Sequence, residues 1–145
     1  MKKILNIILF FSLVFGSCTK EKNFQHHEKG FEYMIVEKSE DGKQPKINDI
    51  LVLDMKYLLN DDSLLFDSKE LNNDFRMKRK KGQVNGSSID DALCLLNLGD
   101  SAVFKINAID FYTFTKRQNA PVGLKQSDEI YFYVRLKNVI DYDHF

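Results

Sequence analysis

The chain has 145 residues, of which 21 are basic and 21 acidic, so its formal net charge is zero. This length corresponds to one domain with a short extension. The balanced charge gives no reason to expect nucleic acid or acidic partners, which bind to basic surfaces.

The first 17 residues have the pattern of a signal peptide. Two lysines follow the initial methionine, and residues 4–15 form a mostly apolar run that is too short to span a bilayer, which takes about 20 residues. Gly16 and Ser17 then precede Cys18, an arrangement that resembles the lipobox of bacterial lipoproteins. The resemblance implies cleavage before Cys18, lipidation of its thiol and a location on a membrane of the bacterial cell envelope. The alternative is an ordinary secretory signal with an incidental cysteine.

Residues 18–30 are polar, so we expect a flexible tether there and a folded domain at residues 31–145. His26 and His27 lie in this tether, but the remaining histidine, His144, is at the far end of the chain. This pattern does not predict a metal site.

Period-two alternation predicts strands through most of the domain. The clearest is residues 51–59, and others are expected at residues 31–37, 64–68, 102–106 and 129–139, with a short apolar patch at 75–77. From Arg76 to Lys81 five of six residues are basic. Because no aromatic residues interleave with them, we interpret this run as a solvated strand edge rather than a nucleic-acid patch.

A single amphipathic helix is predicted at residues 88–98. Ser88 is a suitable N-cap, and Gly99 is expected to end the helix. The apolar face has helical spacing and consists of Ile89, Ala92, Leu93 and Leu96. Cys94 lies beside these positions and is interpreted as a packing residue. A helix of about three turns cannot bury itself. We therefore predict an α+β fold in which a curved, mostly antiparallel sheet wraps one helix.

Residues 107–128 lack a strong period. A segment of this length inside a small domain is usually functional or mobile. It opens with Phe111, Tyr112 and Phe114, which are unfavourable in water. We expect it to close over a site.

This order of elements resembles the FK506-binding-protein (FKBP) family of peptidyl-prolyl isomerases over about residues 31–139. The resemblance rests on Phe66-Asp67-Ser68 after a strand and a turn, and on Phe75 about nine residues later. It also rests on a glycine-bracketed turn into a helix that ends Leu98-Gly99-Asp100, followed by a strand, a long loop and a final alternating strand.

In that family an aromatic pocket between the sheet and the helix holds a proline ring. The resemblance places Asp67 and Tyr112 in catalysis, with the Tyr112 hydroxyl bonded to the substrate carbonyl. It places the substrate-binding side chains at Tyr57, Phe66, Phe75, Ile89 and Phe132. Ile89 stands where many relatives have a tryptophan as the pocket floor, and the chain has no tryptophan.

The resemblance implies a membrane-anchored peptidyl-prolyl cis-trans isomerase that assists the folding of periplasmic or envelope proteins without a cofactor or metal. Its partners would be proline-containing polypeptides and, through the lipid anchor, the membrane, and we expect a monomer. Two alternatives stay open: a non-catalytic peptide-binding or chaperone module, and a structural subunit of an envelope complex. Each aromatic residue of the site, taken alone, also fits an ordinary core position.

Overall fold

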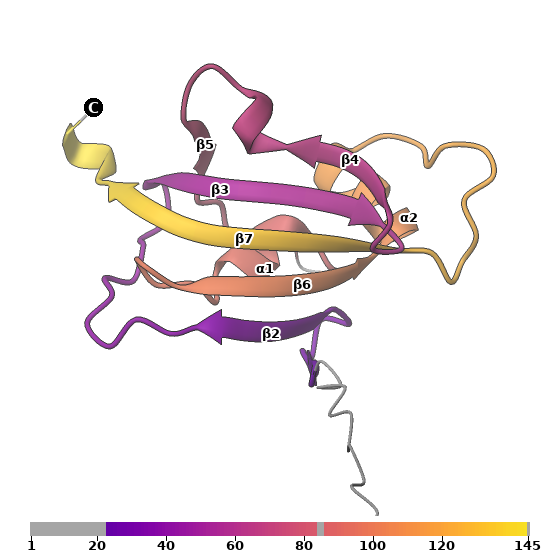
Figure 1. The fold of residues 1–145 in the computed structure, drawn as a ribbon, viewed down its shortest axis with the longest axis horizontal. Coiled ribbons are helices and arrows are strands. Elements are labelled where there is room, and N and C mark those ends of the chain that lie inside the picture. The colour runs from indigo at the N-terminus through magenta and orange to yellow at the C-terminus, as the bar shows by residue number, and fades with distance from the viewer. Residues whose placement is uncertain (1–22, 84–85, 145) are drawn as a thin grey trace, which may run out of the picture.

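An antiparallel sheet of seven strands is the main element of the structure, a computed structural model that describes residues 23–83 and 86–144 (Figure 1). The strands lie in the order β1-β2-β6-β7-β3-β4, and β5 pairs with β3 next to β4. Their bounds are Gln25–His26 (β1), Glu32–Glu37 (β2), Ile50–Leu59 (β3), Ser63–Asp67 (β4), Phe75–Lys78 (β5), Ser101–Asn107 (β6) and Glu129–Ile140 (β7). Every strand predicted from the alternation is present.

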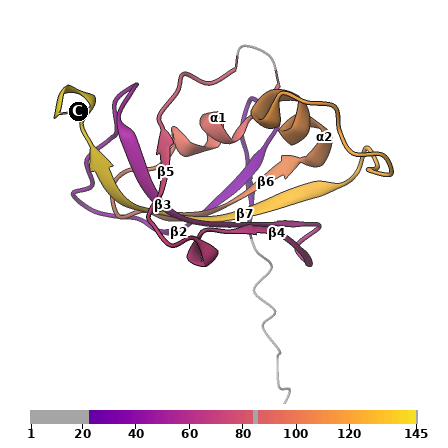
Figure 2. The same ribbon diagram turned by 90° about the horizontal axis from the view of Figure 1, so that it is seen from above.

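The sheet is curved, and its two faces carry different elements (Figure 2). The helices α1 (Ile89–Leu93) and α2 (Ala108–Asp110) lie on the concave face, whereas the single turn η1 (Ser68–Glu70) lies on the convex face. Between the concave face and the helices is the core, whose largest fully buried apolar side chains are Phe31, Leu51, Leu53, Leu96, Phe104, Ile106, Ile130, Phe132 and Leu136. The predicted α+β architecture is confirmed.

The helix lies where it was predicted but is shorter. Its apolar face is buried, and Ser88 caps it in a capping box with Asp91. However, α1 ends at Leu93, and Gly99 does not cap it. The backbone N–H groups that would continue the helix are used elsewhere: Asn97 donates to the buried carboxylate of Asp100, and Gly99 donates to the carbonyl of Leu136 at 2.9 Å. The chain therefore leaves the helix early to reach β6.

The folded body begins before Phe31, so the predicted boundary is too late. Gln25–His26 pairs with β2, the ring of His27 stacks on Phe31 with 4.4 Å between ring centroids, and Lys29 forms an ion pair with Asp91. We call residues 24–30 the N-terminal arm. A polar composition predicts a tether, but this arm attaches to the domain through an ion pair, ring stacking and backbone hydrogen bonds. None of these contacts requires a run of apolar residues, so the sequence pattern does not show them. The predicted signal peptide and Cys18 lie outside the described residues.

The segment after β6 is helical in its first half rather than an irregular loop. Asn107 caps α2, which continues into a π-helical turn, η2 (Phe111–Lys116). Arg117 ends this turn in a left-handed conformation with φ 53°, and its N–H donates to the carbonyl of Tyr112. Three residues of α2 and one π turn are too short to show a helical period in the sequence. Within residues 23–83 and 86–144 no helix has the length and apolarity needed to cross a membrane.

Candidate functional site

Six aromatic side chains, from the neighbouring strands β7, β3, β4 and β5 and from the helical segment, meet on the concave face. Tyr57 stacks on Phe66 with 5.2 Å between ring centroids and lies 4.9 Å from Phe132, and Phe66 lies 5.0 Å from Phe75. We call Tyr57, Phe66, Phe75, Phe111, Tyr112 and Phe132 the aromatic cluster. Tyr57, Phe66, Phe75 and Tyr112 are half-buried, so part of each ring is open to solvent. The aromatic residues predicted from the resemblance are therefore brought together.

Phe111 is the member of this cluster that the sequence did not identify. It is 2% exposed, and its ring lies 5.4 Å from Tyr57, 5.5 Å from Phe132 and 5.3 Å from Tyr112. The signal in the sequence was the run of aromatic residues after the sixth strand, but that run does not show which ring turns inward. The π turn decides this, and it makes Phe111 the centre of the cluster.

Tyr112 lies at the edge of the cluster, half-buried and perpendicular to Phe111. Its carbonyl accepts the backbone N–H groups of Arg117 and Gln118, which fixes the turn that carries it. Within the described part of the chain, its hydroxyl makes no hydrogen bond. The hydroxyl is therefore available to donate to a ligand at the cluster.

The three residues Phe66, Asp67 and Ser68 point in different directions. Phe66 faces the cluster, whereas the carboxylate of Asp67 accepts the N–H of Lys69 at 2.9 Å and caps η1. The buried hydroxyl of Ser68 accepts the N–H of Met55 at 2.9 Å and ties the turn to β3. Asp67 and Ser68 also line a mostly apolar hollow of about 280 Å³ on the convex face. The structure thus directs the carboxylate of Asp67 to the η1 turn rather than to the aromatic rings.

Ile89, predicted as the pocket floor, begins α1 and is 2% exposed. It packs in the core cluster against which Tyr57, Phe66, Phe75 and Tyr112 rest. Its N–H donates to the hydroxyl of Thr115 at 3.1 Å, so the helix start is bonded to the η2 turn. The start of α1 and the η2 turn are therefore held together directly.

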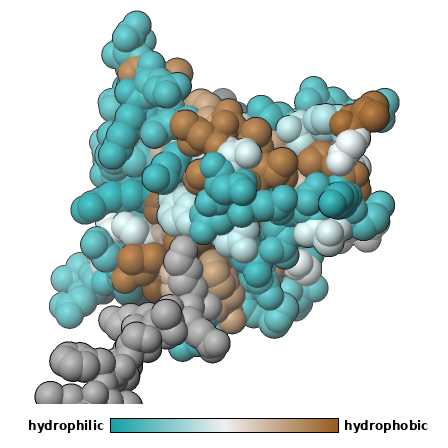
Figure 3. Space-filling model, turned by 45° about the vertical axis from the view of Figure 1, so that its right-hand side comes forward, coloured by the Kyte–Doolittle hydropathy of each residue, from teal (hydrophilic) through white to brown (hydrophobic). Residues whose placement is uncertain are grey.

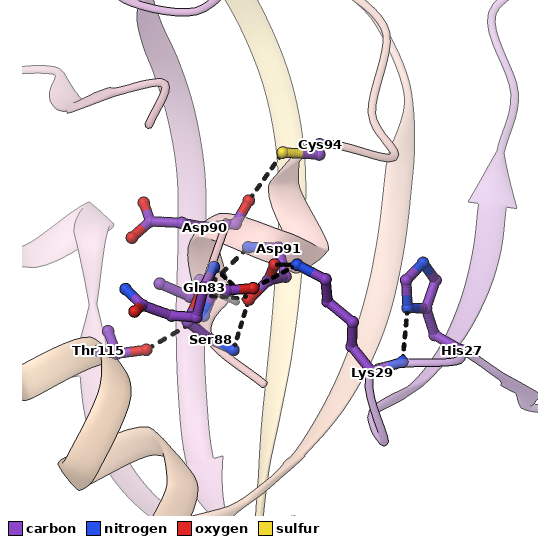
Figure 4. Close-up of polar contacts among 9 residues, drawn as sticks. His27, Lys29, Gln83, Ser88, Asp90, Asp91, Cys94 and Thr115 are labelled. Carbon is purple, nitrogen blue, oxygen red and sulfur yellow. Dashed lines mark hydrogen bonds and ion pairs between the residues drawn. The ribbon is translucent and has the colours of Figure 1, made fainter. Parts of the chain in front are cut away.

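The start of α1 is fixed by a buried carboxylate (Figure 4). Asp91 accepts from the ammonium of Lys29 at 2.5 Å, from the hydroxyl of Ser88 at 2.7 Å and from the N–H of Ser88 at 3.0 Å. Burial raises the pKa of this carboxyl, but Lys29 and the bonds from Ser88 and Gln83 outweigh it, so the pKa lies below its usual range. A Cβ on Gly82 would lie 1.8 Å from Asp91 Oδ1, so only glycine fits there.

Cys94 is half-buried beside this network. Its thiol donates to the carbonyl of Asp90 at 3.1 Å, and burial raises its pKa above the usual value. A thiol held in this state is a poor nucleophile, in agreement with its interpretation as a packing residue. Among the described residues, no group of three His, Cys, Asp or Glu side chains is placed to hold a metal ion.

Two solved structures are similar to this chain in fold. FkpA from Escherichia coli matches with a TM-score of 0.65 and 21% identity over 83% of this chain and 53% of FkpA. The N-terminal domain of FKBP42 from Arabidopsis thaliana matches with a TM-score of 0.58 and 11% identity over 82% of this chain and 93% of that domain. The fold is that of the FK506-binding proteins.

The present chain spans about half the length of FkpA. No family model and no curated protein matches the sequence. At these identities the likeness establishes the FKBP fold alone, and the activity has to be argued from the side chains.

Proposed function

We propose that this protein is an FKBP-type peptidyl-prolyl cis-trans isomerase. The observation that carries the proposal is the aromatic cluster on the concave face of an FKBP fold, in which half-buried rings (Tyr57, Phe66, Phe75 and Tyr112) are linked by ring contacts to the buried pair Phe111 and Phe132. A proline ring is small and apolar, and flat aromatic walls suit it.

The reaction is a bond rotation, so it requires few functional groups from the protein. Rotation about an X–Pro bond is opposed by a barrier of about 18–20 kcal/mol, which arises from amide resonance that is lost at the twisted transition state. An apolar cluster can hold the ring while the acyl side rotates, and the Tyr112 hydroxyl can donate to the carbonyl. A thousandfold acceleration requires a reduction of about 4 kcal/mol. These side chains can supply it without a nucleophile.

A polypeptide is the ligand class that best fits the surroundings of the cluster. Hydrophobic side chains gather in the upper part of the face seen in Figure 3, over the end of the molecule that carries β4. In β4, Leu64 and Leu65 are 52% and 42% exposed and directly precede Phe66. Exposed apolar residues beside a site are typical of a protein-binding surface. The proposal therefore extends to unfolded or extended polypeptides as clients.

The location belongs to the same proposal. A lipid at Cys18 would hold the domain on a membrane of the bacterial envelope, and clients would then be periplasmic or envelope proteins. Support comes from the sequence before residue 23 alone.

The test uses two matched variants of β5. Phe75 and Met77 are both half-buried, face the core and lie on the same strand, but only Phe75 belongs to the aromatic cluster. In an NMR exchange assay with a Phe-Pro peptide, we expect turnover by the wild type, at least a tenfold loss in Phe75→Ala and little change in Met77→Ala. Equal losses of turnover in both variants would show that Phe75 supports the fold rather than the site. A wild type without turnover would refute the proposed isomerase activity.

A second candidate, a non-catalytic peptide-binding module, is favoured by Phe111. Its ring packs against both Tyr57 and Phe132 and takes up space within the cluster. Phe111→Ala would enlarge that space. Peptide binding by the wild type without acceleration, combined with turnover gained in Phe111→Ala, would identify the module.

A further inference from the structure

Two segments that are distant in the sequence are bonded to each other beside the aromatic cluster. They are the start of α1 and the η2 turn, which carries Phe111 and Tyr112. The N–H of Ile89 donates to the hydroxyl of Thr115 at 3.1 Å, and Figure 4 shows this threonine pointing at the helix start. Ile89 is the first residue of α1, so its N–H has no acceptor within the helix. Thr115 therefore supplies an acceptor that the helix itself lacks.

Two further contacts join the same segments. The hydroxyl of Ser87 donates to the carboxylate of Asp110, which directly precedes η2, at 3.2 Å. A Cβ added to Gly86 would lie 2.1 Å from Cε2 of Phe114, so the Phe114 ring packs against the backbone of Gly86. Because the three contacts come from different positions along the helical segment, they restrain both its distance from α1 and its orientation.

The side chain of Tyr112 depends on this turn for its position. Its ring contacts Phe111, which belongs to the same turn, and within the described part of the chain its hydroxyl makes no hydrogen bond. Tyr112 lies three residues before Thr115, so a movement of the turn away from α1 would carry the hydroxyl with it. The bond between Ile89 and Thr115 thus sets where the Tyr112 hydroxyl meets a ligand.

We propose that Thr115 is a positioning residue: by accepting the N–H of Ile89, its hydroxyl holds η2 on the start of α1 and keeps the Tyr112 hydroxyl in place to donate to the peptide carbonyl. The inference rests on the proposed function, since it concerns the same site. Thr115 acts through Tyr112 rather than on the peptide. The rings of Phe66 and Phe75, which would bind the proline, lie on β4 and β5 and are not held by this bond. Thr115 should therefore affect kcat more than KM.

Three variants of the η2 turn test this role. Thr115→Val removes the oxygen and keeps the branched shape, whereas Thr115→Ser keeps the oxygen. Thr113→Val is the control, because Thr113 is exposed and its hydroxyl makes no hydrogen bond within the described residues. In the NMR exchange assay with a Phe-Pro peptide, we expect Thr115→Val to lower kcat about fivefold and to change KM by less than about twofold. Thr115→Ser and Thr113→Val should both stay within about twofold of the wild type.

Stability alone does not separate a positioning role from a structural one, because Thr115→Val leaves the N–H of Ile89 without its acceptor and so destabilises the domain in either case. A double-mutant cycle with Tyr112→Phe separates them. If Thr115 acts through the tyrosine hydroxyl, Thr115→Val should lower kcat by less than about twofold in the Tyr112→Phe background. Every protein is assayed at a temperature below the onset of its circular-dichroism melt, so that loss of folded protein does not enter the comparison.

Failure of the proposed function and failure of this positioning role give different results. A wild type that binds the peptide without turnover refutes the isomerase, and the same cycle is then made on the peptide dissociation constants, measured by NMR titration. A wild type that neither binds nor turns over the peptide refutes both. With an active wild type, the positioning role is wrong if Thr115→Val keeps the wild-type kcat, if Thr115→Ser loses as much as Thr115→Val, or if the loss is equally large without the Tyr112 hydroxyl.

Discussion

At the residue scale, the hydroxyl of Tyr112 offers the sharpest separation of site from scaffold. Tyr112→Phe removes one oxygen that makes no hydrogen bond within the described residues, and it preserves the ring contact with Phe111. We expect kcat/KM for a prolyl peptide to fall about tenfold, which corresponds to about 1.4 kcal/mol. The melting temperature should move by less than about 1 °C, because no stabilising contact is lost. A drop of several degrees in circular-dichroism melts would show that the hydroxyl supports the fold.

Asp67 requires variants that separate its charge from its capping bond. Asp67→Asn keeps an oxygen for the N–H of Lys69 and removes the charge, whereas Asp67→Ala removes both. The cap should be worth about 0.5–2 kcal/mol, so stability should fall only in the alanine variant. If the charge acts on the substrate through the field of the site, both variants lose turnover. Full turnover in Asp67→Asn, measured beside urea unfolding of both proteins, would limit Asp67 to the η1 turn.

How far single residues were predictable depends on whether a regular element fixes their direction. Tyr57 and Phe132 lie on alternating strands, so their common face could be derived before the structure. Phe111 could not, because the π turn that points it inward leaves no period in the sequence. Lys29 could not either, since a lysine in a polar segment carries no sign of a buried partner such as Asp91.

At the scale of the element, α1 depends on its buried face. Leu93 is 3% exposed and lies in the core cluster, whereas its neighbour Cys94 is half-buried and smaller. Leu93→Ala should lower the free energy of unfolding by about 2–5 kcal/mol because it leaves a cavity. Cys94→Ala should cost less than about 1 kcal/mol and serves as the control. Urea unfolding gives both values, and a Leu93→Ala cost below that of Cys94→Ala would contradict the packing of the helix.

Two buried carboxylates, Asp91 within α1 and Asp100 directly before β6, predict how stability depends on pH. Burial raises the pKa of Asp91 and Asp100, but Lys29, Lys38 and hydrogen bonds outweigh it, so both pKa values lie below the usual 3.8. Such groups stabilise the folded state above their unfolded pKa, and the stabilisation is lost as the pH falls through the folded pKa. We expect the free energy of unfolding to decrease below about pH 4.

Asp100 provides the variant that tests this acid dependence. Its side chain is fully buried and accepts from Lys38 at 2.7 Å and from the N–H of Ser39 at 2.7 Å. Asp100→Asn should be less stable at pH 7 by about 1–3 kcal/mol, because it leaves the buried hydrogen bonds incomplete while the exposed Lys38 can return to water. It should also lose less stability between pH 7 and pH 3 than the wild type does. Parallel pH profiles for the two proteins would show that Asp100 does not titrate as inferred.

The elements were predictable to different degrees for a physical reason. Strands that are buried on one face show an alternation of apolar and polar residues in the sequence. Each predicted strand is present, and its ends lie within one residue of the predicted ends. The start of α1 was equally clear because a capping box is local. Its end was not, since it depends on bonds from Asn97 to Asp100 and from Gly99 to the distant Leu136, which the local pattern does not contain.

At the scale of the whole molecule, the chain enters the fold on the face opposite the site. Phe24 packs edge-on against Tyr131, and the ammonium of Lys105 lies 5.1 Å from the Phe24 ring centroid. Tyr131 and Lys105 alternate with core residues and so face the convex side, whereas the aromatic cluster lies on the concave side (Figure 2). A lipid anchor at Cys18 would therefore leave the cluster turned away from its point of attachment.

The anchor itself is tested by Cys18→Ala. This change should move the protein from the membrane fraction to an unprocessed or released form, because it removes the thiol that is proposed to carry the lipid. The melting temperature of the domain should be unchanged, since Cys18 precedes the N-terminal arm. Membrane fractionation with mass spectrometry of the N-terminus measures the first result. A Cys18→Ala protein that is processed and stays on the membrane would exclude the lipoprotein form.

The N-terminal arm gives the last prediction, because it decides where the domain begins. A chain that starts at Asn23 keeps the pairing of β1 with β2 and the ion pair between Lys29 and Asp91, whereas a chain that starts at Phe31 loses both. We expect the shorter chain to unfold more easily by about 1–3 kcal/mol, the worth of a hydrogen bond to a charged group at a partly buried site. Lys29→Met in the longer chain removes the ion pair alone and should account for most of that loss. If the two chains unfold at the same urea concentration, the arm contributes nothing, and residues 23–30 act as a tether after all.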